Sequence, residues 1–98
     1  MHFEWDEAKN RRNLPKHGIN FEIANSVFED PFALSIQDCV VEDEERWQTL
    51  GAIGGVVIVL VAHTHEEEGG EEVVRIISAR KATPLEGRAY EQGRKGQR

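Results

Sequence analysis

The chain has 98 residues, of which 39% are hydrophobic and 31% are charged, and its net charge is −6. This length predicts a single domain over residues 1–98, and the composition excludes an intrinsically disordered chain. The longest apolar run, residues 56–62, is far shorter than the roughly 20 residues that span a bilayer, so no transmembrane helix is expected.

Two helices are predicted in the first third of the chain. Asp6 is a favourable N-cap for a helix over residues 7–13. Pro15 lacks a backbone donor and is expected to end or kink that helix just before it. Asn20 then caps a second predicted helix over residues 21–29, whose apolar residues recur at helical spacing.

Beyond residue 32 the apolar residues alternate, which predicts four short strands. These strands cover residues 33–37, 46–53, 56–63 and 72–79. Gly54 and Gly55 predict a two-residue hairpin turn between the second and third strands. The acidic stretch 42–45 is expected to be a solvated connection, and the stretch 66–70 a mobile loop.

A capping pattern predicts a last helix, with Thr83 at the N-cap, Pro84 at the first helical position and Glu86 at the third. It is expected to cover residues 84–92, followed by a frayed basic tail over residues 93–98. Consecutive strands with short links form an antiparallel sheet. We therefore predict an α+β fold in which a four-stranded antiparallel sheet is preceded by two helices and followed by a C-terminal helix.

The two-residue turn at the glycine pair also predicts how the strands align. Arg46 would face His63, and a second two-residue turn at residues 69–70 would place His63 opposite Ile76. One sheet face would then carry Arg46, Gln48, His63, Ser78 and Arg80. The other face, packed against the helices, would carry Trp47, Ile53, Ile58, Leu60, Val73 and Ile77, together with Arg75. A slip of one residue in the turn would exchange these faces.

Familiar catalytic motifs are absent from the sequence: there is no phosphate-binding glycine loop, no His-Glu-x-x-His motif and no evident Ser-His-acid set. His63 and His65 precede three glutamates, but polar residues at a hairpin end more often form a solvated loop than a metal site. We expect neither a metal nor a cofactor.

Cys39, the single cysteine, is interpreted as a small, partly buried apolar residue. Because no internal disulfide can form and no signal-like segment opens the sequence, a cytoplasmic protein is expected.

Acidic and basic residues are unevenly distributed along the chain. Residues 1–18 carry a net charge of +1, residues 19–72 carry −12 and residues 73–98 carry +5. Local potential, rather than net charge, decides which surface can hold a phosphate. If both ends fold onto one side they form a basic surface; the alternative is that these are solvated charges on helix faces.

Several short blocks of sequence stand in a characteristic order. They begin with Phe-Glu-Trp-Asp-Glu-Ala-Lys at residues 3–9, continue through residues 13–14, 16–19, 21–22, 27–31, 45–46 and 51, and close with Arg-Ile-Ile-Ser-Ala-Arg at residues 75–80 and Tyr-Glu at residues 90–91. In this arrangement the chain resembles the BrnT family of bacterial toxins over residues 3–91. Two features depart from the family pattern: Pro15, where a helix-forming residue is expected, and the acidic stretch 66–72, which lengthens the last hairpin.

The resemblance implies a ribonuclease toxin of a type II toxin–antitoxin system, with a fold similar to the RelE toxins, that arrests growth by cleaving RNA. It implies a BrnA-like antitoxin with a ribbon-helix-helix region as the partner, so that operator DNA is bound only by the hetero-oligomeric complex. The alternative is a non-catalytic, degenerate toxin-like module that binds an antitoxin and takes part in operator autoregulation.

The resemblance also implies metal-independent cleavage, in which the RNA 2′-hydroxyl attacks the adjacent phosphate. The catalytic candidates are Arg80, Arg75, His17, Lys9 and Tyr90, and the candidate RNA contacts are Arg46, Lys16 and Arg88. The arginines would stabilise the phosphate, and His17, which unlike His63 lies in a matching block, would carry a proton. Lys9 would assist electrostatically, and Tyr90 would donate a proton or stack on a base. Each role has a structural alternative: the arginines pair with the acidic segment, His17 caps the first helix, and Tyr90 and Trp5 belong to the core.

Overall fold

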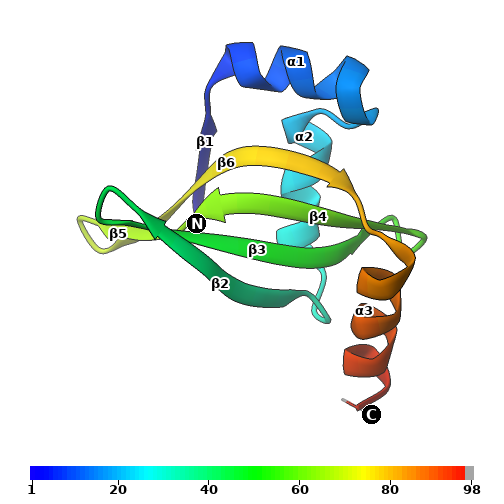
Figure 1. Ribbon diagram of the computed structural model, residues 1–98. Coiled ribbons are helices and arrows are strands. Elements are labelled where there is room, and N and C mark those ends of the chain that lie inside the picture. Colours follow the sequence, from blue (N-terminus) through cyan, green and yellow to red (C-terminus); the bar gives the residue numbers. More distant parts are fainter. Residues whose placement is uncertain (97–98) are drawn as a thin grey trace.

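The computed structural model describes residues 1–96 as a twisted sheet with helices packed on both faces (Figure 1). In chain order the elements are β1 (His2–Trp5), α1 (Glu7–His17), α2 (Phe21–Ala24), the 3₁₀ helix η1 (Asn25–Glu29), β2 (Leu34–Val41), β3 (Glu44–Ile53), β4 (Val57–Thr64), β5 (Glu66–Glu68), β6 (Glu71–Lys81) and α3 (Pro84–Gly96). Five of the six strands lie in the order β1-β6-β4-β3-β2, and the sixth, the short β5, pairs with β6 outside this order.

The α+β class is confirmed, but the prediction of four antiparallel strands preceded by two helices was wrong. The chain opens with a strand, and β1 lies parallel to β6 while the other neighbouring strands are antiparallel, so the sheet is mixed. The alternation of Phe3 and Trp5 that marks β1 covers only four residues. Its partner strand lies near the other end of the chain, beyond the reach of any local pattern.

Helix α1 continues through Pro15 and ends at His17, so of the two outcomes predicted for Pro15, an end or a kink, the end was wrong. Asp6 caps it as predicted, accepting hydrogen bonds from two backbone N–H groups of the first turn at 2.8 and 3.3 Å. Pro15 lies on the exposed side of the last turn, where the carbonyl that its ring leaves unpaired can bond to water. Gly18 closes the helix with φ of 74°, a left-handed conformation that glycine adopts without steric cost.

The second predicted helix, residues 21–29, forms two shorter pieces, α2 and η1. Asn20 caps α2 as predicted, and its side-chain oxygen accepts a hydrogen bond from the N–H of Ile23 at 2.8 Å. Val27 of η1 is fully buried where η1 meets β3. A Cβ atom added at Gly51 of β3 would lie 2.6 Å from Cγ1 of Val27, so the glycine allows η1 to approach the sheet closely.

The β2–β3 hairpin turns at Glu42 and Asp43, whose φ angles are 50° and 65°. Two consecutive positive φ values are typical of tight hairpin turns. The acidic stretch predicted as a connection is therefore mostly turn and strand: β2 extends to Val41, and both Glu44 and Glu45 belong to β3.

The β3–β4 hairpin is one residue longer than predicted, because Ile53 pairs with Val57 rather than with Val56. His63 consequently lies opposite Trp47, and Arg46 lies opposite Thr64. Since a slip of one residue exchanges the two faces of a strand, the prediction that Arg46 and His63 share a face was wrong.

The β5–β6 hairpin turns at Gly69 and Gly70 as predicted, and His63 lies opposite Ile76 as predicted. The preceding residues 66–68 form β5, whereas a mobile loop was predicted. A bulge at Ile77 then shifts the alternation along β6. Arg75 and Arg80 therefore share one face of the sheet, although a regular strand would place them on opposite faces.

Two apolar clusters hold the helices to the sheet. On one face, residues of α2, η1 and the loop before α2 pack on the central strands: Ile19, Phe21, Ala24, Val27, Val59, Val61, Val74, Ile76 and Ala79. On the other face, Tyr90 of α3 packs with Leu50 and Leu60. The prediction of a single helix-packed face was wrong, because helices cover both faces. The slip in the β3–β4 hairpin also divides the predicted set, with Ile53 on the α2 side and Ile58 and Leu60 on the α3 side.

Helix α3 begins at the predicted capping pattern, with the Thr83 hydroxyl accepting from the N–H of Glu86 at 3.2 Å and the Glu86 carboxylate accepting from the N–H of Thr83 at 2.9 Å. It continues to Gly96, so residues 93–96 of the predicted tail are helical, and residues 97–98 lie outside the described residues. Within the described chain, no helix has the length and apolar character needed to cross a membrane.

Candidate functional site

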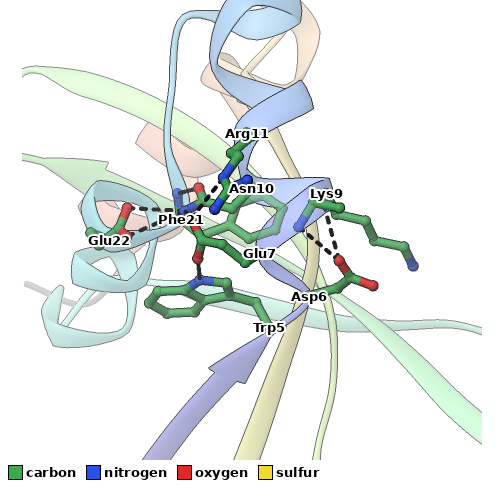
Figure 2. Close-up of polar contacts among 9 residues, drawn as sticks. Trp5, Asp6, Glu7, Lys9, Asn10, Arg11, Phe21 and Glu22 are labelled. Carbon is green, nitrogen blue, oxygen red and sulfur yellow. Dashed lines mark hydrogen bonds and ion pairs between the residues drawn. The ribbon is translucent and has the colours of Figure 1, made fainter.

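The block at residues 3–9 builds a polar junction between β1, α1 and α2 (Figure 2). Asn10 is buried at its centre, where its side-chain oxygen accepts from the N–H of Phe21 at 2.7 Å. Its amide group donates to Glu7 and to Glu22 at 3.2 Å each. The indole N–H of Trp5 also donates to Glu7 at 3.2 Å. The first blocks of the family resemblance therefore hold the N-terminal elements together.

The side chain of Asn13 links α1 by hydrogen bonds to the part of β6 that extends beyond β1. Its amide group donates to the carbonyl oxygens of Ile19 at 2.7 Å and of Ala79 at 2.8 Å, and its side-chain oxygen accepts from the N–H of Ala79 at 3.3 Å. The side chain thus pairs with Ala79 in the way that a neighbouring strand would. Only β1 residues up to Trp5 pair with β6, so this amide satisfies an edge that would otherwise be open.

Three of the predicted site residues lie on α1. Lys9 and Lys16 are exposed, and His17 is half-buried in the last turn. His17 follows Asn13 by four residues and so lies about one turn, roughly 5.4 Å, further along the same side of the helix. Asn13 bonds to Ala79, and the C-terminal end of α1 lies toward the C-terminal end of β6 (Figure 1). His17 is the last residue of α1, so it lies at the end of β6 that carries Arg80.

Arg80 forms a two-pronged ion pair with Glu86 at the start of α3. Its two Nη atoms donate to the two carboxylate oxygens at 2.8 and 3.0 Å. These hydrogen bonds from Arg80 lower the pKa of Glu86 to about 2, although burial opposes the shift, and the same contact raises the pKa of Arg80. Arg80 therefore helps to hold α3 to the sheet, and its partner lies outside the acidic segment with which the structural alternative paired it.

Arg75 and Arg46 meet at one carboxylate, that of Glu44. Nη2 of Arg75 lies 2.5 Å from one oxygen of Glu44, and Nε of Arg46 lies 3.9 Å from the other. Arg75 comes from β6, and the other two residues come from β3. The structure thus brings two predicted phosphate-binding residues together, at the end of the sheet away from Arg80.

Tyr90 is a core residue that anchors α3 to the loop after η1. It is only 2% exposed, and its hydroxyl donates to Asp30 at 2.5 Å, while the N–H of Ala52 donates to the same carboxylate at 2.8 Å. Burial and the bond to Asp30 raise the pKa of Tyr90 to about 12. Burial acts to raise the pKa of Asp30, but the hydrogen bonds from Tyr90 and from backbone N–H groups hold it below its ordinary value. These contacts favour the structural role of Tyr90.

The remaining predicted RNA contact, Arg88, is exposed on α3. It borders a shallow hollow of about 450 Å³ between α3 and Ile58. A second cleft, of about 400 Å³, lies beside Tyr90 and is lined by Phe32 and Arg94, with the guanidinium carbon of Arg94 5.8 Å from the centre of the Phe32 ring. Neither cleft contains Arg75 or Arg80.

His63 is 2% exposed, so its interpretation as part of a solvated hairpin end was wrong. Its Nε2 lies 2.7 Å from the Thr49 hydroxyl, and its Nδ1 lies 3.0 Å from the carbonyl oxygen of Thr64. Burial lowers the pKa of His63, which favours the neutral ring, and both ring nitrogens have hydrogen-bond partners. His65 lies apart, 3.8 Å from Glu72, and no cluster of three His, Cys, Asp or Glu side chains suited to a metal occurs among residues 1–96.

Cys39 is exposed on the edge strand β2, so the prediction of a partly buried residue was wrong. The strand is longer than predicted and lies at the border of the sheet, where a single neighbour covers it.

One face of the sheet carries three of the predicted arginines, with Arg46 and Arg75 at one end and Arg80 at the other. We call it the open sheet face: the α3 side of the sheet outside the area that α3 covers, where Glu44, Arg46, Gln48, Arg75, Ser78 and Arg80 lie. Glu44 is the functional candidate that sequence reasoning missed. The sequence feature that could have identified it is the tight turn at Glu42 and Asp43, because a strand that begins directly after this turn places Glu44 and Arg46 on the same face.

These features define a small α+β protein with guanidinium groups on an open sheet face, and guanidinium is the side-chain group that pairs with phosphate through two parallel donors. Comparison with protein families matches residues 5–86 to the model of the ribonuclease toxin BrnT of type II toxin–antitoxin systems. The chain therefore belongs to the BrnT family.

A solved structure supports this membership. The chain is similar to the crystal structure of the ribonuclease toxin BrnT of Brucella abortus, with 27% sequence identity and a TM-score of 0.60, over 85% of this chain and 97% of that one. Comparison with curated proteins gives no match.

Proposed function

We propose that this BrnT family member cleaves RNA by a metal-independent mechanism on the open sheet face. The observation that carries the proposal is the placement of Arg46, Arg75 and Arg80 on this one face, which the hairpin register and the bulge at Ile77 bring about. An RNA strand that follows β6 would meet Arg75 with Arg46 at one end and Arg80 at the other. The surrounding acidic charge lies mostly in the turns and strands of residues 42–72.

The proposed reaction is an attack of the RNA 2′-hydroxyl on the adjacent phosphorus. This reaction requires three things from the protein: removal of the hydroxyl proton, stabilisation of the crowded phosphate and protonation of the leaving 5′-oxygen. Arginine suits the second task because its planar group offers two parallel donors to phosphate oxygens. Since the nucleophile belongs to the RNA itself, no metal-activated water is needed.

Roles for the α1 residues remain part of the proposal. Lys9 and Lys16 would attract the RNA backbone from the exposed side of α1, and Arg88 would do so from α3. His17, at the Arg80 end of β6, would carry a proton to or from that end of the substrate. Tyr90 would contribute by holding α3 in place.

We further propose a RelE-like fold relationship and a BrnA-like partner with a ribbon-helix-helix region, which would neutralise the toxin in the cytoplasm and bind operator DNA within the complex. The support for this partner is the family, since a type II toxin is paired with an antitoxin. A non-catalytic module that only binds the antitoxin is the competing function.

Expression in a bacterium separates the two functions. Induction of the chain alone is expected to arrest growth and deplete intact messenger RNA, and co-expression of its neighbouring antitoxin gene is expected to restore growth. Normal growth on induction of a folded protein that still binds the antitoxin tightly would establish the non-catalytic module instead.

A further inference from the structure

The cluster formed by Glu44, Arg46 and Arg75 places one carboxylate beside two guanidinium groups on the open sheet face. The Glu44 side chain is 24% exposed, so it is partly sheltered yet reachable from solvent. Both of its oxygens face guanidinium groups, at 2.5 Å from Arg75 and at 3.9 Å from Arg46. A phosphate bound by either arginine would therefore lie directly beside this carboxylate.

The neighbouring titratable groups do not offer an equivalent base. Glu4 of β1 lies beside Arg75 in the sheet register, but its carboxylate is 3.8 Å from the ring of His2 and is half exposed. His63 is buried on the opposite face with both ring nitrogens occupied. His17 lies toward the other end of β6, about 15 Å along the strand from Arg75 at the usual rise per residue.

We propose that Glu44 is the general base of the cleavage reaction and that the scissile phosphate lies at the Arg46–Arg75 end of the open sheet face. This inference rests on the proposed ribonuclease function. The Glu44 carboxylate takes the proton of the 2′-hydroxyl while the 2′-oxygen forms a bond to phosphorus. The bond from phosphorus to the 5′-oxygen breaks, and that oxygen takes a proton from water. The products are a 2′,3′-cyclic phosphate and a 5′-hydroxyl.

The arginines have a defined part in this step. Before RNA binds, Arg75 is paired with Glu44; when a phosphate arrives, it competes for the same guanidinium donors. Loosening the ion pair frees carboxylate lone pairs for the 2′-hydroxyl, and the guanidinium groups then stabilise the charge that develops on phosphate. One cluster thereby supplies both the base and the electrostatic stabilisation.

The test compares Glu44→Gln with Glu45→Gln. Both substitutions remove one negative charge from adjacent residues of β3, but Glu45 points to the opposite side of the strand and is exposed. A base provides roughly 100-fold to 10,000-fold of rate, so Glu44→Gln is expected to lose at least about 100-fold in RNA cleavage. Glu45→Gln is expected to cleave like the wild type. Antitoxin affinity and the melting temperature of both variants serve as controls for folding.

The pH profile distinguishes a base from a group that only positions Arg75. Glutamine still accepts a hydrogen bond from Arg75, so positioning is largely preserved in Glu44→Gln. A cleavage reaction that uses a general base slows in acid, so the wild-type rate is expected to fall there, and the residual activity of Glu44→Gln is expected to lack this fall.

Three results would overturn the inference. If folded Glu44→Gln cleaves RNA as fast as Glu45→Gln, Glu44 is not the base and the ribonuclease function stands. If its cleavage is slow but keeps the acid fall of the wild type, Glu44 is a positioning residue. If the wild type itself cleaves no RNA, the proposed function fails and this inference fails with it.

Discussion

Arg75→Ala is expected to lower RNA cleavage about 100-fold, because it removes a donor that stabilises phosphate charge in the transition state. The fold is expected to survive, since Arg75 is 43% exposed and its partner Glu44 remains near Arg46. The measurement is the cleavage rate of a defined RNA oligonucleotide, with the melting temperature recorded on the same preparation. Arg12→Ala, an exposed change of the same type on α1, is the matched control and is expected to keep its activity.

Arg80→Ala provides an informative contrast to Arg75→Ala. Its ion pair with Glu86 links β6 to α3, so this variant is expected to lose stability as well as activity. Arg80→Lys is expected to restore only part of both, because an ammonium group cannot reproduce the planar two-donor contact. If Arg75→Ala cleaves at the wild-type rate and only Arg80→Ala is slow, the scissile phosphate lies at the Arg80 end, contrary to our placement.

Asn13→Ala is expected to be the most destabilising single substitution in α1, by about 3 kcal/mol. It leaves the carbonyl oxygens of Ile19 and Ala79 and the N–H of Ala79 without their side-chain partner, and an unsatisfied buried polar group costs about 1–3 kcal/mol. Urea unfolding monitored by circular dichroism measures the change. Asn25→Ala, at a half-buried asparagine of η1, is the control and is expected to change stability by less than about 0.5 kcal/mol.

Equal unfolding free energies for Asn13→Ala and the wild type would contradict the role given to this amide. Asn13→Asp tests the donor role of the Asn13 amide group separately, because a carboxylate cannot donate a hydrogen bond to either carbonyl oxygen. It is expected to destabilise the protein at least as much as alanine does.

Local capping chemistry could be predicted from the sequence because its partners are two or three residues apart. Asp6, Asn20 and the pair Thr83 and Glu86 all cap helices as expected. Pro15 was misjudged because its position in an exposed last turn removes most of the cost that a proline imposes inside a helix.

The composition of the sheet faces could not be predicted, because it depends on single residues at two irregularities. One extra residue in the β3–β4 turn moved His63 away from Arg46, and the bulge at Ile77 moved Arg75 to the side of Arg80. Both errors concern the register of strand pairing, and a shift of one residue moves every following side chain of a strand to the other face of the sheet. The arginines themselves were identified from the family-like block, but their common face and their carboxylate partner Glu44 required the structure.

The measurement that tests the central claim most directly is the chemistry of the RNA ends left by the purified toxin in the presence of EDTA. A single-site oligonucleotide and its counterpart with a 2′-deoxy sugar at the cleaved position would be treated side by side, and the products identified by mass spectrometry. Cleavage through the 2′-hydroxyl predicts a 2′,3′-cyclic phosphate and a 5′-hydroxyl from the first substrate and no cleavage of the second. Products with a 3′-hydroxyl and a 5′-phosphate, or activity abolished by EDTA and restored by a divalent metal, would contradict the account.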